Sequence, residues 1–210
     1  MTMPGIEQID AMYRGEIRLP SGEVMLPPWE TGAPEPVVAG LLAAGRLTGR
    51  VLDAGCGTGR NTGLLAESGL DVVGFDGAPT AIERARANHP GLTFVQADAA
   101  NLGFDGEFDT VLDMGLFHML PPEKRAPYAA GLHRSLRPRG SAILVAFSQV
   151  APIGVIAEAF GPGWELAEPE PVALRGKIQD GIAQGDWLGA KPGADGFLEI
   201  PANVVTARRT

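Results

Sequence analysis

The sequence predicts an α/β protein whose doubly wound, mostly parallel sheet ends in an antiparallel hairpin. Short apolar runs alternate with amphipathic segments between residues 51 and 147, which is the pattern of strands alternating with helices. Five strands connected in this way form a parallel sheet with helices on both faces. Trp164–Val172 and Asn203–Arg209 read as two further strands, so we expect seven strands in all.

The composition is that of one globular domain. The chain has 210 residues, 45% hydrophobic and 20% charged, and a net charge of −8 that argues against a nucleic-acid partner. It shows neither a long apolar run nor an apolar leader, so we expect no membrane partner. A single cysteine, Cys56, excludes an internal disulfide and fits a cytoplasmic location. The three histidines lie far apart in the sequence, which predicts no metal site.

The N-terminal part predicts two helices joined by an irregular segment. Residues 5–14 have the apolar spacing of a short helix, and a second helix is expected to start at Pro34 or Pro36. Residues 15–33 are rich in Pro and Gly and therefore predict an ordered loop. Within it, Trp29 is either a hydrophobic plug on the core or part of a lid over a ligand.

A strand, a tight glycine turn and a helix start follow one another after residue 50. Gly55, Gly57 and Gly59 come directly after a short apolar run that ends in Asp53. Glycine lets a ligand lie directly on the turn, and the first N–H groups of the next helix attract an anionic or carbonyl-rich group. A dinucleotide fingerprint would need glycine or alanine in place of Arg60. We expect Asp53 to hold a cationic amine or to order the turn.

Acidic residues also stand at the ends of the second and third predicted strands, which are expected at Asp71–Asp76 and Leu92–Gln96. Asp76 lies 21 positions after Gly55, close to the roughly 20-residue offset at which an acid binds ribose hydroxyls, although it also precedes a helix expected at 79–88. Asp98 and the backbone N–H of Ala99 form a pair that suits an adenine edge, or Asp98 caps a turn. Because the carboxyl ends of parallel strands meet at one edge, these groups are expected to share one site.

The rest of the chain supplies the fourth and fifth strands. Phe108–Asp113 and Ser141–Phe147 read as strands, and a helix is expected from Pro121 to about Arg137.

A long insert, 173–200, separates the two strands of the expected hairpin. It carries Trp187, Leu188 and Phe197 and a weak helix signal at 175–185. It forms either part of a substrate lid or a long surface loop.

Four stretches resemble motifs of the class I S-adenosylmethionine-dependent methyltransferases. D-x-G-x-G-x-G at residues 53–59 resembles motif I, and FDTVLDMGLFHML at residues 108–120 resembles motif IV. P-W-E-x-G-x-P at residues 28–34 resembles the segment that closes over the methionine end of the cofactor in small-molecule methyltransferases of the thiopurine and tellurite-resistance type. LHRSLRPRGSAILVAF continues the likeness to residue 147, departing at Arg139, where a glycine is usual.

The resemblance implies a Rossmann-like seven-stranded sheet, with S-adenosylmethionine as cofactor and S-adenosylhomocysteine as product. It divides the single domain, 1–210, into an N-terminal lid and helix (1–45), a cofactor-binding core (46–148) and a C-terminal segment on the substrate side with the terminal hairpin (149–210). The residues expected to bind the cofactor come from the lid, the glycine turn and the ends of the following strands: Trp29, Gly32, Asp53, Ala54, Gly55, Cys56, Gly57, Asn61, Asp76, Gly77, Ala97, Asp98, Ala99, Asp113, Met114 and Gly115.

We therefore expect methyl transfer to a small molecule, most simply to the thiol sulfur of an apolar acceptor, which attacks the methyl carbon in line with the sulfonium that leaves. A thiol, with a pKa of about 8.5, is already partly ionised at neutral pH and needs no base. For an oxygen or nitrogen acceptor, His118 is the leading candidate base, with Asp113 behind it, although His118 is equally well explained as a packed residue at a helix start. A cofactor-binding module without catalytic activity is a further alternative. Monomer and homodimer both stay open.

Overall fold

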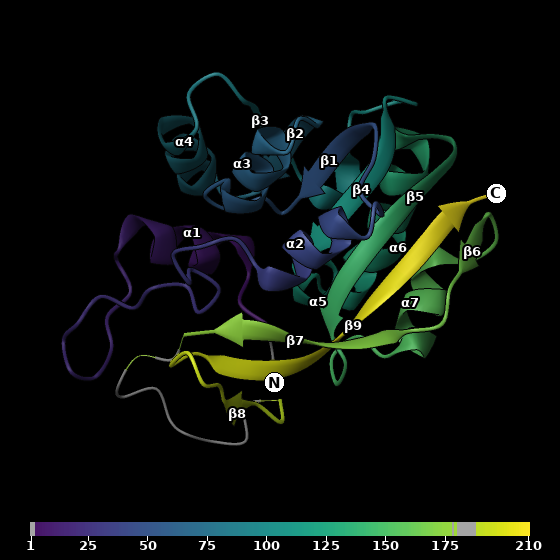
Figure 1. The fold of residues 1–210 in the computed structure, drawn as a ribbon. Coiled ribbons are helices and arrows are strands. Elements are labelled where there is room, and N and C mark those ends of the chain that lie inside the picture. Colours follow the sequence, from purple (N-terminus) through teal and green to yellow (C-terminus); the bar gives the residue numbers. More distant parts are fainter. Residues whose placement is uncertain (1–2, 178, 180–187) are drawn as a thin grey trace.

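The computed structural model describes residues 3–177, 179 and 188–210. One mixed sheet runs through it in the order β3-β2-β1-β4-β5-β9-β6, with β7 and β8 also paired to β9 (Figure 1). The strands are β1 Arg50–Ala54, β2 Asp71–Asp76, β3 Thr93–Gln96, β4 Phe108–Met114, β5 Leu136–Phe147, β6 Trp164–Leu166, β7 Glu170–Gly176, β8 Lys191–Pro192 and β9 Leu198–Arg209. The helices are α1 Ile6–Arg14, α2 Pro36–Ala43, α3 Arg60–Glu67, α4 Pro79–Asn88, α5 Leu116–Met119, α6 Pro122–Ser135 and α7 Ile153–Phe160, with a 3-10 turn, η1, at Ala99–Asn101.

The first five strands are parallel, as the alternation of strands and helices predicts. β1 pairs with β2 on one side and with β4 on the other, and its last residue, Ala54, lies beside Phe75 and Asp113. β3 continues the sheet beyond β2, where Asp76 pairs with Gln96. The carboxyl ends of these four strands therefore meet at one edge of the sheet, where the predicted ligand groups lie.

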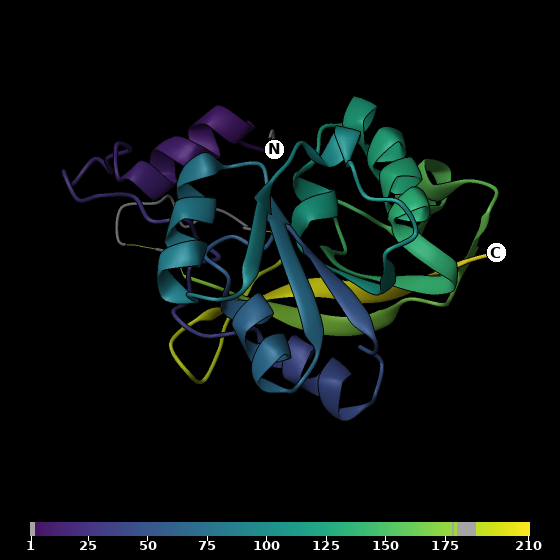
Figure 2. The ribbon, with the colours of Figure 1, turned by 90° about the horizontal axis from the view of Figure 1, so that it is seen from above.

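Both faces of the parallel half are covered by helices (Figure 2). Leu52 and Val111 belong to a buried cluster with Tyr128 and Leu132 of α6. The side chains next to them along the strands, such as Val51 and Leu112, belong to a second cluster with residues of α2 and α3. Strands buried on both faces have nearly continuous apolar sequences, which explains why the runs in β1 and β4 lack a polar alternation.

The predicted antiparallel C-terminal strands are present, but two strands, β6 and β7, share one side of β9. β9 pairs antiparallel with β5 along one side, as the class of fold predicts. On its other side β6 pairs with Ala207–Arg209, whereas β7 pairs with Leu198–Val204. The single strand expected at Trp164–Val172 is therefore two short strands. The weak helix signal at 175–185 is not realised at Arg175 and Gly176, which belong to β7, and most of that range lies outside the described residues.

The entry to β5 also differs from the prediction. β5 begins at Leu136, and its pairing with β4 shifts register between Phe108 and Thr110. Arg139 adopts a φ of 67°, the left-handed region that favours glycine, and its side chain is exposed. The arginine that replaces the usual glycine thus leaves the turn intact and adds backbone strain.

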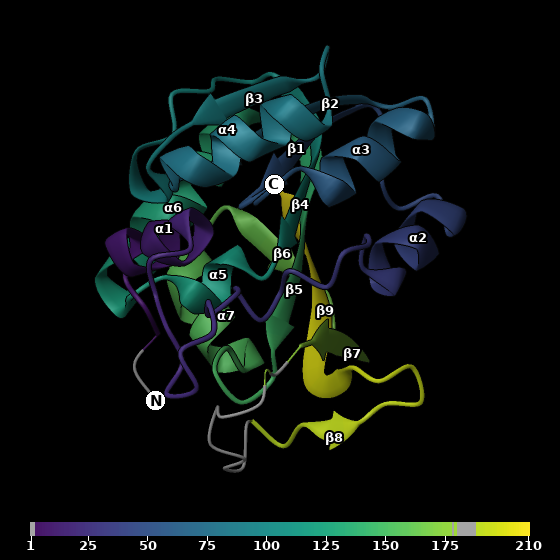
Figure 3. The same cartoon turned by 90° about the vertical axis from the view of Figure 1, so that its left-hand side faces the viewer.

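The N-terminal segment lies over the carboxyl ends of the strands. α1 packs against α4, and Figure 3 shows it in front of the sheet edge, close to α4 and α5. Ile6 and Tyr13 reach the glycines at the ends of β2 and β1, since a Cβ placed on Gly77 or Gly57 would come within 3.0 Å of these side chains. Among the described residues, no helix is long and apolar enough to cross a membrane.

Candidate active site

A cavity of about 850 Å³ lies where the N-terminal segment covers the strand ends. Its wall is formed by α1, the loop before α2, the glycine turn, the ends of β2 to β5, α5 and β7. Thirteen residues expected to serve cofactor binding or catalysis line it: Trp29, Gly55, Cys56, Gly57, Asn61, Asp76, Gly77, Ala97, Asp98, Ala99, Met114, Gly115 and His118. The geometry therefore brings residues from four strand ends and from the lid into one space.

The glycine turn has the backbone conformation that its sequence predicts. Gly55 and Gly57 have φ values of 71° and 55°, which L side chains rarely adopt. The N–H groups of Gly55 and Cys56 both donate to the carbonyl of Phe75, at 2.8 and 2.9 Å, so the turn is fixed to β2. α3 begins directly after it at Arg60, so the positive end of the helix dipole lies beside the turn.

Asp76 connects the glycine turn to the start of α4. Its Oδ2 accepts from the N–H of Gly57 at 3.0 Å and its Oδ1 accepts from the N–H of Ala78 at 2.8 Å. Burial raises the pKa of Asp76 above its ordinary value, against the lowering effect of these bonds. Asp76 thus bonds the residue that precedes α4 and does not cap the helix itself, and its carboxylate also borders the cavity. Ribose binding by Asp76 stays a prediction.

Asp98 likewise combines a local role with a place in the cavity wall. Its Oδ1 accepts from the N–H of Ala100 at 3.0 Å, and its Oδ2 lies 3.1 Å from Nζ of Lys124. The backbone bond and the lysine together lower the pKa of Asp98. The turn-capping interpretation is therefore correct, and contact with an adenine edge stays a prediction.

Four of the expected site residues do not line the cavity: Gly32, Asp53, Ala54 and Asp113. Asp53 is 1% exposed and accepts from Thr62 Oγ1 at 2.6 Å, so it fixes α3 from below the turn. This position does not allow Asp53 to hold a cationic amine in the cavity. Burial raises its pKa to about 7.

Asp113 orders the backbone after β4. Its carboxylate accepts from the N–H groups of Leu116 and Phe117 and from the hydroxyl of Tyr128 at 2.8 Å. Burial raises the pKa of Asp113 to about 6. With no exposure to the cavity, Asp113 is placed to hold α5 rather than to take a proton from an acceptor.

His118 lines the cavity as a neutral, packed ring. It is 3% exposed, stacks on Phe147 with ring centroids 3.9 Å apart, and burial lowers its pKa to about 3. Its Nδ1 accepts from the N–H of Phe147 at 3.3 Å, which leaves the ring hydrogen on Nε2. Both nitrogens of the neutral ring are thus accounted for, one as an acceptor already in use and one as a donor.

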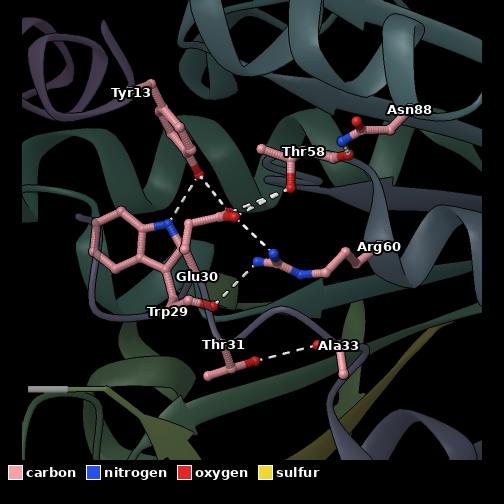
Figure 4. Close-up of polar contacts among 8 residues, drawn as sticks. All are labelled: Tyr13, Trp29, Glu30, Thr31, Ala33, Thr58, Arg60 and Asn88. Atoms are coloured by element: carbon pink, nitrogen blue, oxygen red, sulfur yellow. Dashed lines mark hydrogen bonds and ion pairs between the residues drawn. The ribbon is translucent and has the colours of Figure 1, made fainter. Parts of the chain in front are cut away.

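A polar cluster holds the lid segment on the glycine turn (Figure 4). Trp29 Nε1 donates to Tyr13 Oη at 2.9 Å, and burial raises the pKa of that tyrosine, which therefore stays a neutral phenol. The carboxylate of Glu30 accepts from Thr58 Oγ1 at 3.3 Å and from Arg60 Nη1 at 2.6 Å. Trp29 therefore lines the cavity and is hydrogen-bonded to α1, and its role as a lid or as a plug on the core stays a prediction.

The sequence interpretation did not single out Tyr13, Glu30 or Arg60 as site residues, yet all three line the cavity. A signal for two of them was present, since Glu30 stands inside the P-W-E-x-G-x-P stretch and Arg60 ends the glycine turn. In the insert, Leu188 lines the cavity and the Phe197 ring lies 5.3 Å from the Arg175 guanidinium, whereas Trp187 lies outside the described residues.

Comparison with known proteins identifies the superfamily. The sequence profile of a methyltransferase domain family matches residues 51–140. The chain is 39% identical over 151 residues to the 2-heptyl-1-hydroxyquinolin-4(1H)-one methyltransferase of Mycobacteroides abscessus, covering 69% of this chain and 66% of that protein. It is 32% identical over 157 residues to the probable thiol methyltransferase 2 of Arabidopsis thaliana, covering 71% and 67%. The chain thus spans about two thirds of the length of both relatives.

Solved structures agree with this assignment. A structure described as "Conversion of a Disulfide Bond into a Thioacetal Group during Echinomycin Biosynthesis" superimposes with a TM-score of 0.80 at 33% identity, over 97% of this chain and 92% of that one. The magnesium protoporphyrin IX methyltransferase of Synechocystis PCC 6803, with S-adenosylmethionine bound, gives a TM-score of 0.58 at 26% identity, over 83% and 76%. The chain belongs to the class I S-adenosylmethionine-dependent methyltransferases.

Proposed function

We propose that this methyltransferase acts on a small molecule and transfers the methyl group to the sulfur of an apolar thiol. The observation that carries the proposal is that each carboxylate lining the cavity, among the described residues, is held by an ion pair or a backbone hydrogen bond, while His118 is a neutral packed ring, so none of them stands as a free base. Such a site suits an acceptor that ionises without help from a base.

The residues at the polar side of the cavity fit the cofactor. The glycine turn leaves no Cβ between backbone and ligand, and Asp76 and Asp98 lie at strand ends where ribose hydroxyls and an adenine edge would meet them. The cofactor supplies an electrophilic methyl group on a sulfonium. The task of the chain is to bind it, to direct an acceptor in line with that methyl and to exclude water.

Each carboxylate in the described cavity wall has a protein partner. Glu30 is paired with Arg60, and Asp98 with Lys124. Glu35 accepts from the backbone N–H of Arg175, and Asp76 from two backbone N–H groups. His118 is neutral at physiological pH with its Nδ1 in use. A neutral alcohol would need a base. A thiol is a few per cent thiolate near neutral pH and is intrinsically nucleophilic, with a pKa of about 8.5.

The other side of the cavity is apolar and adaptable. Every methionine in the described part of the chain lines it: Met3, Met12, Met25, Met114 and Met119. Unbranched thioether side chains fill irregular spaces and adjust to partners of different shape. We therefore expect an apolar acceptor body, with tolerance for variation in its size. The probable thiol methyltransferase of Arabidopsis thaliana supports sulfur as the acceptor atom.

One observation favours a second candidate. The relative from Mycobacteroides abscessus is named for a hydroxyquinolinone that carries a heptyl chain, which is also an apolar acceptor. The alternative is thus methylation at oxygen or nitrogen of an apolar heterocycle, in which His118 would have to give up its bond from the N–H of Phe147 before it could serve as the base.

A panel of acceptors tests the two candidates against each other. The protein is incubated with labelled S-adenosylmethionine and with aryl and alkyl thiols, phenols, amines and a 1-hydroxyquinolin-4-one, and the products are identified by mass. We expect methylated thiols, with a rate that rises with pH as the acceptor ionises. Methylation confined to oxygen or nitrogen acceptors would overturn the thiol proposal.

A further inference from the structure

Glu30 and Arg60 form an ion pair in the cavity wall that joins the lid to the first residue of α3. Arg60 Nη1 lies 2.6 Å from Glu30 Oε2, and the two side chains are 24% and 17% exposed. Both line the cavity beside the glycine turn, and a Cβ on Gly57 would lie 3.8 Å from Glu30 Oε1. The pair therefore places one negative and one positive group at the glycine turn, partly shielded from solvent.

Neither member of the pair is saturated by its described partners. A guanidinium has five N–H donors, and the contacts of Arg60 use one on Glu30 and one on the carbonyl of Trp29. A carboxylate has about four lone-pair positions, and Glu30 receives Arg60, the single hydroxyl hydrogen of Thr58 and a long contact of 3.5 Å from Tyr13. Both groups therefore have capacity for a ligand in the cavity.

The cofactor offers a complementary pair of charges. The amino-acid end of S-adenosylmethionine is a zwitterion, with an ammonium and a carboxylate on one carbon. Asp53, which the motif offers for the ammonium, is buried beneath the turn and bonded to Thr62. We propose that Glu30 receives the ammonium group of the cofactor and Arg60 its carboxylate, assisted by the positive end of the α3 dipole.

In this assignment the bound cofactor links the lid to the cofactor-binding core. Glu30 lies on the lid next to Trp29, while Arg60 belongs to the cofactor-binding core. Binding of the zwitterion adds ligand bonds to both segments, so the amino-acid end of the cofactor fastens the lid. The inference concerns the cofactor alone and does not depend on which acceptor is methylated.

Calorimetry with two ligands separates this role from a purely structural one. S-adenosylhomocysteine carries the amino-acid end, and 5′-methylthioadenosine lacks it. In Glu30→Gln and Arg60→Gln, we expect the affinity for S-adenosylhomocysteine to fall about 10- to 100-fold, the size of a lost charge-assisted bond. The affinity for 5′-methylthioadenosine should change less than about twofold, which also shows that the variant is folded. The matched control is Glu170→Gln, which breaks the Arg46–Glu170 ion pair away from the cavity and should leave both affinities unchanged.

Equal losses for both ligands would overturn the assignment, since the ion pair would then only hold the lid. No loss for either ligand would overturn it too, since the pair would then not contact the cofactor.

Two analogues of S-adenosylhomocysteine assign each charge separately, one lacking the amine and one lacking the carboxylate. Wild type should bind both weakly. Glu30→Gln should be insensitive to loss of the amine, and Arg60→Gln to loss of the carboxylate. Full sensitivity retained in the variants would contradict the proposal, and Glu30→Asp and Arg60→Lys provide conservative versions of the same test.

Discussion

The two sides of the cavity are built in different ways. The strand-end side consists of short segments directly after β1 to β4, and it is fixed by backbone hydrogen bonds such as those from the N–H groups of Gly55 and Cys56 to the carbonyl of Phe75. The lid side is held by side chains from distant parts of the sequence, such as Tyr13, Glu30 and Arg60. The first arrangement follows from the order of strands, whereas the second depends on long-range contacts. The strand-end side is therefore suited to the nucleoside, and the lid side to closure and to the acceptor.

The largest expected effect is on the pH dependence of stability, and it comes from Asp53, which is buried under the glycine turn. Its pKa is raised to about 7 by burial, above the value of about 3.9 in an unfolded chain. The protonated form is thus favoured in the fold, and the stability linked to Asp53 is complete below pH 4 and is lost as the pH rises to about 7. The shift corresponds to on the order of 4 kcal/mol.

The measurement is urea unfolding of wild type and Asp53→Asn at a series of pH values. Because Asn does not ionise, the stability of the variant relative to wild type should rise between pH 4 and pH 7. Parallel curves for the two proteins would show that Asp53 titrates as it does in an unfolded chain.

The second effect concerns Asp76 at the end of β2. Asp76→Ala removes the acceptor of two N–H groups and the predicted partner of the ribose, so the affinity for S-adenosylhomocysteine should fall about 10- to 100-fold in calorimetry. Asp71→Ala changes the exposed carboxylate at the other end of the same strand and is the matched control. An unchanged affinity in Asp76→Ala would refute the ribose assignment.

A smaller effect on stability is expected at Tyr128. Its hydroxyl donates to Asp113 in the buried layer under α5. Tyr128→Phe should lower the free energy of unfolding by about 1–3 kcal/mol, since the carboxylate loses a donor while staying buried. The affinity for the cofactor should change little, and a loss of affinity as large as that of Asp76→Ala would place Asp113 in the cofactor site after all.

The smallest effect is expected at His118 on the acceptor side. Glutamine retains an acceptor for the N–H of Phe147, and a pKa of about 3 keeps the ring of His118 neutral across the working range. Turnover of a thiol by His118→Gln should therefore change less than about fivefold, and the pH–rate profile of wild type should follow the acceptor alone. A collapse of turnover with intact cofactor binding would identify His118 as the base.

Site residues could be located from the sequence where the short-range pattern of strands and turns determines their position. The glycine turn, Asp76 and Asp98 lie at strand ends, and short-range patterns indicate strand ends well. The direction in which a side chain points could not be predicted in this way. Asp53 and Asp113 stand in motifs at strand ends, yet both turn away from the cavity, toward Thr62 and Tyr128, which are 9 and 15 residues distant in the sequence.

The C-terminal strands illustrate the same limit in the fold. Apolar alternation predicts β9, but the division of its far side between β6 and β7 is set by pairing, which periodicity does not encode. Glu30 and Arg60 are 30 residues apart in the sequence, and only the packing of the N-terminal segment on the glycine turn brings them together.

A crystal structure with S-adenosylhomocysteine bound tests the central claim most directly, namely that the ends of β1 to β4 hold the cofactor beneath the lid. The account predicts the ribose at Asp76, the adenine at Asp98 and the sulfur facing the wall formed by Met114 and His118. Density for the ligand at any other place on the chain would contradict it.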